Sequence, residues 1–234
     1  EVDASLVLTF DRALSEVSAE DFVSTVLAET LDTKVVLVGA DFRFGAGGAG
    51  DVALLRELGE LHGFEVVVID DIAFDEGRRV SSTFVRELLT EGRVAEAGQL
   101  LTAAHSVRGV VVLGQQRGRE LGYPTANLDR NLEGFIPADG VYAAWLVIDG
   151  VRFAAAVSIG NNPTFDGVPE KQVEAHALDQ DFDIYGKRVE IEFVAYVRGM
   201  VKYTTVDALI DQMCLDEVAV REILGVAAKG TANS

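Results

Sequence analysis

Val141-Tyr-Ala-Ala-Trp-Leu-Val-Ile148 is followed by Asp149-Gly150 and then by Val151-Arg-Phe-Ala-Ala-Ala-Val-Ser158. Both apolar runs are rich in residues that favour extended structure. An Asp-Gly pair between two such runs is a strong signal for a two-residue hairpin turn, because both residues tolerate a positive φ. This stretch therefore predicts two adjacent antiparallel strands.

The rest of the second half continues this pattern. Further β-rich runs lie at 106–113, 172–178 and 188–197, and no helical pattern separates them. An amphipathic helix is predicted over Thr205–Leu224, with Gly225 as its stop. Consecutive antiparallel strands followed by one helix predict a small antiparallel β-barrel with a C-terminal helix.

The first half alternates strands with helices. Strands are expected at Ser5–Phe10, Lys34–Val38 and Phe64–Ile69. One helix should be capped by Ser18, and the others are expected over 51–62, 82–91 and 93–101. Alternating strands and helices are typical of a parallel, doubly wound α/β sheet. We expect two domains, an α/β domain over 1–104 and the barrel domain over 105–234.

Composition narrows the class of protein. The chain has 234 residues, 49% of them hydrophobic, and a formal net charge of −18. Such an acidic chain is a poor partner for nucleic acid or for an anionic membrane, and its apolar runs are too short to cross a bilayer. The single cysteine, Cys214, fits a reducing compartment, so we expect a cytoplasmic protein. The oligomeric state stays open.

A glycine-rich segment suggests one alternative function. Gly45–Gly50 satisfies G-x-G-x-x-G, and Asp70 follows 20 residues later, as in a dinucleotide-binding fingerprint. This pattern would suit an NAD(P)-dependent oxidoreductase. However, residues 39–44 separate the segment from the preceding strand, whereas the fingerprint begins directly after a strand. A glycine loop ahead of a helix is the favoured interpretation.

A second segment carries more chemistry. It runs Gly114-Gln-Gln-Arg117-Gly118-Arg-Glu-Leu-Gly122-Tyr-Pro124-Thr125-Ala-Asn127-Leu128. Its glycines allow backbone N–H groups to approach an anion closely, and its arginines add positive charge. Thr125 and Asn127 are two residues apart, so in an extended segment they point to the same side. Their neutral oxygens would suit Mg²⁺ shared with substrate phosphates, but spacing alone favours a turn in which both side chains bond to the backbone.

The same segment resembles the riboflavin kinase signature, whose core is Pro-Thr-Ala-Asn. Further pieces of the chain match that family in order, and the resemblance covers residues 106–224. The matching pieces are 137–142, 159–165, Val173-Glu-Ala-His176, Asp183-Ile-Tyr-Gly186 and Tyr196-Val-Arg198.

The resemblance implies that ATP phosphorylates riboflavin to FMN, with ATP and flavin as substrates and Mg²⁺ as cofactor. It assigns Glu174 as the catalytic base, whereas without the resemblance a solvent-exposed strand carboxylate is the favoured interpretation. It assigns His176 and Arg198 to the flavin site and to the protein flap that covers the flavin. It implies that Thr125 and Asn127 are the Mg²⁺ ligands. It implies that the nucleotide phosphates are bound by Gly114, Arg117, Gly118, Gly122, Pro124, Thr125 and Asn127.

The first half resembles the adenylyltransferase half of the prokaryotic bifunctional riboflavin kinase/FAD synthetase family, a partial Rossmann-like nucleotidyltransferase fold. The segments that show this resemblance are Gly39-Ala-Asp-Phe-Arg-Phe-Gly45 and Arg79-Val-Ser-Ser-Thr-Phe-Val-Arg86. The family's Gly-x-Phe-Asp-Gly-x-His-x-Gly-His loop does not occur in this sequence, and the chain starts without Met, so we expect an N-terminal truncation and little FAD formation. The expected adenylyltransferase residues are Asp41, Phe44, Arg79, Ser82, Thr83 and Arg86.

A third function remains open at this stage. A barrel of this kind could bind flavin or a protein partner without catalysing any reaction, because a fold alone does not fix a function. Replacing Glu174 separates the two possibilities, since a kinase would lose turnover whereas a binding protein would not change.

Overall fold

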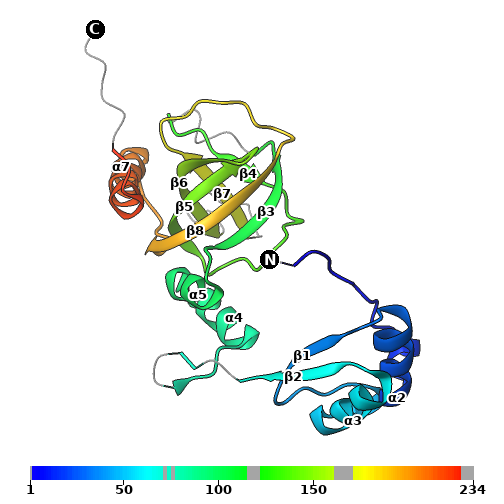
Figure 1. The fold of residues 1–234 in the computed structure, drawn as a ribbon. Coiled ribbons are helices and arrows are strands. Elements are labelled where there is room, and N and C mark those ends of the chain that lie inside the picture. Colours follow the sequence, from blue (N-terminus) through cyan, green and yellow to red (C-terminus); the bar gives the residue numbers. More distant parts are fainter. Residues whose placement is uncertain (1, 71–72, 75–76, 115–121, 161–170, 228–234) are drawn as a thin grey trace. The chain divides into compact units, whose positions relative to one another are not determined.

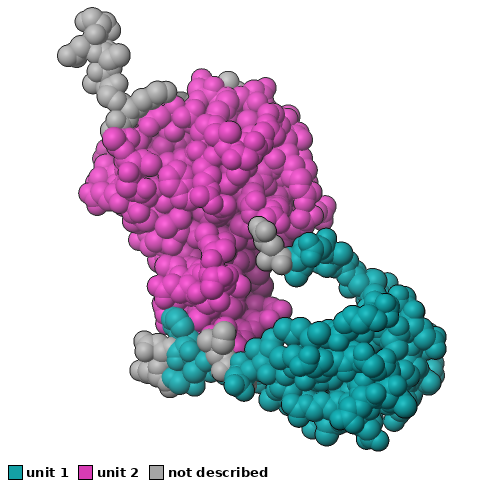
Figure 2. Space-filling view, in the orientation of Figure 1, with its two compact units in different colours: residues 1–79 teal, residues 80–234 magenta. Residues whose placement is uncertain are grey.

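The computed structural model describes residues 2–70, 73–74, 77–114, 122–160 and 171–227 (Figure 1). The chain divides into two compact units, Glu1–Arg79 and Val80–Ser234, which are coloured separately in Figure 2. Each unit is described by itself.

Unit 1 opens with helices and then forms a small parallel sheet. A short helix α1 covers Arg12–Ser15, and α2 (Ala19–Asp21) continues as the π-helix η1 (Phe22–Thr30). Strands β1 (Val35–Gly39) and β2 (Glu65–Ile69) pair in parallel. Between them lie the 3₁₀ turn η2 (Ala46–Gly48) and helix α3 (Val52–His62), so the segment is one βαβ unit.

Sequence signals explain most of these boundaries. The Ser18 hydroxyl accepts a hydrogen bond from the Asp21 backbone N–H at 2.9 Å, which confirms the expected cap. Asp51 caps α3 in the same way, and Gly63 ends that helix with a φ of 81°. The core is formed by the apolar faces of these elements: Ala19, Val23, Val38, Phe44, Leu55, Leu58 and Phe64.

The strand expected over Ser5–Phe10 is wrong. These residues have no regular structure, and Leu6, Val7 and Phe10 are exposed. An alternating apolar segment forms a strand only where another strand accepts its hydrogen bonds. Within the described residues β1 pairs only with β2, so no neighbour stabilises this segment.

Unit 2 begins with two helices and continues as a closed barrel (Figure 1). The helices are α4 (Ser82–Thr90) and α5 (Val94–Leu101), and α5 packs on β8 and β3. The barrel order is β3-β4-β7-β6-β5-β8, and every neighbouring pair is antiparallel. Its strands are β3 (His105–Val112), β4 (Ala126–Leu128), β5 (Gly140–Ile148), β6 (Val151–Gly160), β7 (Gln172–Ala177) and β8 (Arg188–Arg198).

The barrel confirms the expected fold class. The β5–β6 hairpin turns at Asp149 and Gly150, whose φ angles of 50° and 81° are both positive, as a two-residue turn of this type requires. Inside the barrel, the ring of Tyr142 packs edge-on against Phe193 at 5.3 Å. The Tyr142 hydroxyl donates to the Ala138 carbonyl at 2.6 Å, and burial raises the pKa of this phenol above its usual value.

Helix α7 (Val206–Leu224) closes the unit against the barrel, as expected from the sequence. Thr205 caps its N-terminus, and Gly225 ends it with a φ of 66°. Val220 is fully buried in a cluster with Ala143 and Leu178. This contact fixes one face of the helix to β5 and to the end of β7.

The compact units divide 25 residues before the expected domain boundary. Residues 80–104 belong to unit 2, where the last turn of α4 is bonded to the segment ahead of β5: the Ala138 N–H donates to the Leu89 carbonyl at 2.9 Å. A Cβ on Gly92 would lie 3.1 Å from the ring of Tyr196. The domain assignment of 1–104 and 105–234 stays a prediction.

Two glycines test the barrel packing. Gly134 has a φ of 101°, and a Cβ there would lie 2.6 Å from the Ser106 carbonyl oxygen, whereas a Cβ on Gly150 would meet open space. Gly150→Ala should lower the free energy of unfolding by about 1–2 kcal/mol through backbone strain alone. Gly134→Ala should cost about 1–3 kcal/mol more, because the added methyl group also overpacks the barrel.

Denaturation in urea, followed by tryptophan fluorescence, checks this difference. The only tryptophan, Trp145, lies on β5, so the signal reports the barrel. Equal losses of stability in the two variants would contradict the packing at Gly134.

Candidate functional site

The structure brings Thr125, Asn127 and Glu174 together. Asn127 of β4 is paired directly with Glu174 of β7 in the antiparallel ladder. The Thr125 hydroxyl donates to Glu174 Oε2 at 3.5 Å, and Asn127 Nδ2 donates to Thr125 Oγ1 at 3.3 Å. The three side chains, which the sequence assigns to one reaction, therefore lie side by side on one face of the sheet.

Strand alternation explains this arrangement. Ala126 and Leu128 point into the barrel and are buried, so Thr125 and Asn127 lie on the other face and are half-buried. On β7, Val173 and Ala175 are buried in the same way and leave Glu174 half-buried beside its partner. A shift of one residue in this register would exchange the polar and apolar faces.

A cavity of about 260 Å³ opens beside Thr125 and Asn127, and Glu174 does not line it. Gly114, two residues after β3, forms part of its wall, and a Cβ there would clash with the side-chain amide of Asn127. The backbone therefore approaches Asn127 as closely as a glycine permits. Besides these residues the cavity is lined by Pro124, Thr125, Ala126, Val111, Leu146, Ala175, Ala177 and the loop residues 180–185.

The donor set fits a hard divalent cation. A threonine hydroxyl and an asparagine amide supply neutral oxygens at the cavity wall, which suits Mg²⁺ whose charge is balanced by substrate phosphates. In the part of the chain that the structure describes, no group of three or more His, Cys, Asp or Glu side chains is arranged to hold a metal ion.

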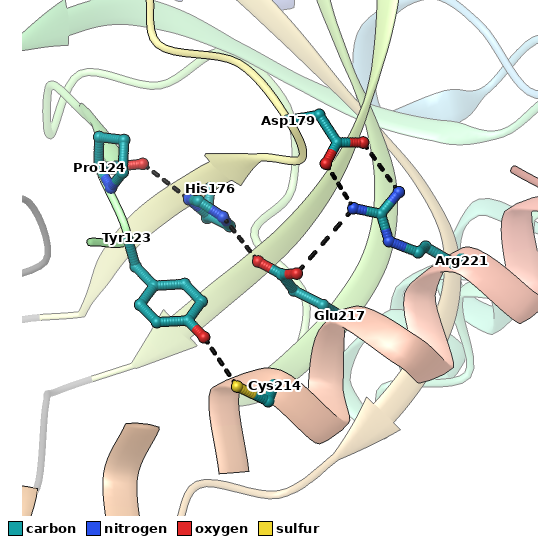
Figure 3. A network of polar contacts seen from close by, with 7 residues as sticks. All are labelled: Tyr123, Pro124, His176, Asp179, Cys214, Glu217 and Arg221. Carbon is teal, nitrogen blue, oxygen red and sulfur yellow. Dashed lines mark hydrogen bonds and ion pairs between the residues drawn. The ribbon is translucent and has the colours of Figure 1, made fainter. Parts of the chain in front are cut away.

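His176 connects the site to helix α7 (Figure 3). Its Nδ1 lies 2.9 Å from the Pro124 carbonyl oxygen, and its Nε2 lies 3.1 Å from Glu217 Oε1. Both ring nitrogens are thus engaged within the protein. The expected contact of His176 with flavin stays a prediction.

Arg198 is also held by α7. Its Nε and Nη2 donate to the two carboxylate oxygens of Asp216 at 2.7 and 2.6 Å, and Asp216 is buried. Burial disfavours the charge on Arg198, but the hydrogen bonds to Asp216 outweigh this and raise its pKa. Its guanidinium lies 6.0 Å from the ring centre of Tyr203. The flap role of Arg198 stays a prediction.

The remaining residues assigned to the phosphates are placed only in part. Gly122 is exposed and has a φ of 84°. Arg117 and Gly118 lie outside the described residues. The expected nucleotide contacts of this segment therefore stay predictions.

The adenylyltransferase residues are divided between the two units. In unit 1, Arg79 donates to both carboxylate oxygens of Asp41, at 2.7 and 3.1 Å, and these bonds lower the pKa of Asp41. Phe44 is buried and stacks on Phe42 at 5.6 Å, so it serves the core of that unit. Its expected contact with flavin stays a prediction.

In unit 2, Ser82, Thr83 and Arg86 lie exposed on α4. Thr83 and Arg86 line a surface pocket of about 300 Å³. The hydroxyl that caps the helix belongs to Ser81 instead, which accepts from the Phe84 N–H at 3.2 Å. Glu87 and Glu91 line the same pocket, so it holds two carboxylates beside the one guanidinium. The role of Ser82, Thr83 and Arg86 stays a prediction.

The glycine loop of residues 45–50 has a structural explanation. It is closed by hydrogen bonds between Phe44 and Gly50. A Cβ on Gly45 would lie 2.5 Å from the Ala19 backbone, and one on Gly50 would lie 2.7 Å from the Phe44 ring. These glycines therefore allow close packing inside unit 1, as the favoured interpretation of the sequence expected.

Sequence reasoning missed two parts of this region. One is the loop 180–185, which lines the cavity. The Asp183-Ile-Tyr-Gly186 segment resembles the kinase family and could have indicated these residues, but it was not assigned to the site. The other is Glu217, which reaches His176 from 41 positions away in the chain. No local pattern marks such a contact, because it depends on how α7 packs on the barrel.

Comparisons with known proteins agree with this geometry. The riboflavin kinase family profile matches residues 101–224, and the FAD synthetase profile matches residues 1–84. None of the helices among the described residues has the length and apolar character needed to cross a membrane.

Individual relatives match both halves at once. The bifunctional riboflavin kinase/FMN adenylyltransferase of Escherichia coli (strain K12) is 35% identical over 226 residues, which cover 96% of this chain and 71% of that protein. The Listeria monocytogenes protein of the same description is 35% identical over 216 residues, covering 92% of this chain and 68% of that protein.

A solved structure is similar as well. A crystal structure described as a macrolide-efflux protein from Streptococcus pneumoniae superposes with a TM-score of 0.80 at 35% identity, covering 91% of this chain and 67% of that one. These findings support neither the oxidoreductase nor the non-catalytic barrel. Because the matches span both units and the barrel holds the Pro-Thr-Ala-Asn segment beside Glu174, the chain belongs to the bifunctional riboflavin kinase/FMN adenylyltransferase family and carries that family's kinase domain.

Proposed function

We propose that this chain uses Glu174 as the base that activates the riboflavin hydroxyl and Thr125 and Asn127 as ligands of Mg²⁺. The observation that carries the proposal is the pairing of Asn127 with Glu174, with Thr125 bonded to both side chains. Riboflavin phosphorylation by ATP is the activity of the family to which the chain belongs.

The proposed reaction needs two contributions from the protein, a base and the positioning of both substrates. Glu174 accepts the proton of the ribityl 5′-hydroxyl as its oxygen forms a bond to the terminal phosphorus of ATP. The bond between that phosphorus and the bridging oxygen breaks, so that ADP leaves and FMN remains. The proton then passes from Glu174 to solvent. Positioning of the two substrates supplies much of the acceleration, because phosphoryl transfer needs little covalent chemistry from the enzyme.

Thr125 and Asn127 would hold Mg²⁺ at the cavity wall. When bound, the ion supplies positive charge to the phosphate oxygens. Gly114 keeps the backbone close to Asn127, so this part of the wall can also follow the phosphates closely. The G-x-x-x-x-G-K-[ST] motif does not occur in the sequence, which is consistent with a different way of holding ATP.

We also propose that the chain binds small-molecule substrates and neither nucleic acid nor membranes, and that it is located in the cytoplasm. The net charge of −18 is unfavourable for nucleic acid, and the single cysteine fits a reducing compartment. ATP and flavin are substrates of the family.

A product assay tests the overall assignment. The 234-residue chain, incubated with riboflavin, ATP and Mg²⁺, should form FMN, and chromatography of the flavins checks this. With FMN and ATP it should form little FAD, because its sequence contains no His-x-Gly-His segment. Absence of FMN would contradict the kinase proposal, and rapid FAD formation would contradict the second expectation.

Glu174→Gln tests the base. We expect kcat for FMN formation to fall by about 100-fold or more, because the amide cannot accept the hydroxyl proton. Calorimetry should show that riboflavin and Mg²⁺·ADP still bind. Glu190→Gln is the matched control, since Glu190 is a strand carboxylate of β8 that pairs with Arg108. Similar turnover in the two variants would refute the role of Glu174.

Gly114→Ala tests the metal position. The added methyl group would meet the free end of the Asn127 side chain, so Asn127 should move while the barrel stays folded. The half-saturating Mg²⁺ concentration should rise roughly fivefold or more, which corresponds to about 1 kcal/mol. Gly150→Ala, at the hairpin turn, serves as control. An unchanged Mg²⁺ requirement in Gly114→Ala would argue against Asn127 as a ligand.

A further inference from the structure

The contacts of His176 point beyond the proposed reaction. This residue is only 9% exposed, and it lies two residues after Glu174 on the same strand. It joins two elements that are far apart in the sequence, the Pro124 carbonyl ahead of β4 and Glu217 on α7 (Figure 3). A buried imidazole engaged on both sides fixes the distance between these elements.

The hydrogen-bond partners of His176 define the roles of its two ring nitrogens. A carbonyl oxygen only accepts hydrogen bonds, so Nδ1 carries a proton and donates to Pro124. Nε2 faces a carboxylate oxygen, and a hydrogen bond there needs one further proton between His176 and Glu217. The contact with Glu217 therefore holds the ring in the orientation that keeps Nδ1 beside the Pro124 carbonyl.

Pro124 is the residue at which such a bond matters most. The ladder between β4 and β7 begins with Ala126 opposite Ala175, so Pro124 lies ahead of the paired residues. Proline has no backbone N–H, and its carbonyl is the group through which the segment can be held. Thr125 is the next residue, and its hydroxyl bonds to Glu174.

Helix α7 holds the same segment at a second point. The Tyr123 hydroxyl lies 3.0 Å from Cys214 Sγ, and the hydrogen bond with Cys214 raises the pKa of Tyr123 to about 12. The Tyr123 ring packs edge-on against His176 at 5.3 Å. Glu217 is itself 4.0 Å from Arg221, which forms a two-bond ion pair with Asp179 at 2.8 and 2.9 Å.

We infer that His176 and Glu217 are positioning residues, which hold the Pro124 carbonyl so that Thr125 and Asn127 are arranged for Mg²⁺ and nucleotide. The inference rests on the proposed function, because it takes Thr125 and Asn127 as the metal ligands. It gives α7 a part in the kinase site although Glu217 does not line the cavity.

Binding of Mg²⁺·ADP, measured by calorimetry, tests the inference without turnover. Glu217→Leu removes the acceptor and should weaken binding about threefold to tenfold, the equivalent of one hydrogen bond. Glu217→Gln should stay within about twofold of the natural chain, because its amide can donate to Nε2 while Nδ1 still donates to Pro124. Equal affinities for Glu217→Leu and Glu217→Gln would overturn the inference.

Variants of His176 provide the matching comparison. His176→Asn keeps a donor near the position of Nδ1, so it should bind Mg²⁺·ADP better than His176→Phe, which keeps only a ring. In a His176→Phe background, Glu217→Leu should have almost no further effect, since the two residues act as one unit. Additive losses would contradict this coupling.

Asp179→Asn controls for general loosening of α7. It weakens the ion pair with Arg221 and leaves the bond to Pro124 intact, and asparagine tolerates the φ of 60° at this position. Amide hydrogen exchange over residues 122–128 should accelerate in Glu217→Leu and not in Asp179→Asn. Acceleration in both variants would reduce the role of Glu217 to general stability and overturn the inference.

The experiments distinguish failure of the inference from failure of the proposed function. If the natural chain forms FMN and the Glu217 and His176 variants bind Mg²⁺·ADP normally, only the positioning role fails. If the natural chain forms no FMN, the proposed function fails first. Should His176→Phe not fold, which loss of the Trp145 fluorescence signal would show, the two Glu217 variants still decide the question.

Discussion

The pairing of the three-residue strand β4 with β7 is the constraint on which the candidate site depends. It sets Asn127 opposite Glu174 and turns Ala126 and Ala175 into the barrel. The same register therefore buries the apolar side chains in the core and brings Asn127 and Glu174 together. Barrel closure makes this possible, because β4 is hydrogen-bonded to β3 on one side and to β7 on the other, and a strand this short would be marginal by itself.

Helix α7 contributes to the site as well as to the fold. Val220 anchors its apolar side, while Asp216 reaches Arg198 at the end of β8 and Glu217 reaches His176 near the end of β7. Removing one member of the buried Arg198–Asp216 pair would leave a charge without its partner, which is costly inside a protein. In this way the orientation of one amphipathic helix is tied to two strands that carry residues assigned to the kinase reaction.

Much of this architecture follows from local signals, and the exceptions have physical reasons. The Asp149-Gly150 pair predicted the β5–β6 hairpin, because a turn of this type needs two residues with positive φ angles. Strand β4 was not predicted as a strand, since three residues after a proline show too little alternation. Ser5–Phe10 shows clear alternation and yet forms no strand, because alternation does not supply a pairing partner. The contact between His176 and Glu217 depends on the packing of α7 and is invisible in either segment.

The central claim is that the Pro-Thr-Ala-Asn segment binds the divalent ion beside Glu174. The most direct measurement replaces Mg²⁺ by paramagnetic Mn²⁺ in the ADP complex and follows the side-chain amide signals by nuclear magnetic resonance. The account predicts that the signal of Asn127 broadens strongly on addition of Mn²⁺, whereas that of Gln99 on α5 keeps its width. A sharp Asn127 signal in the Mn²⁺·ADP complex would contradict the account.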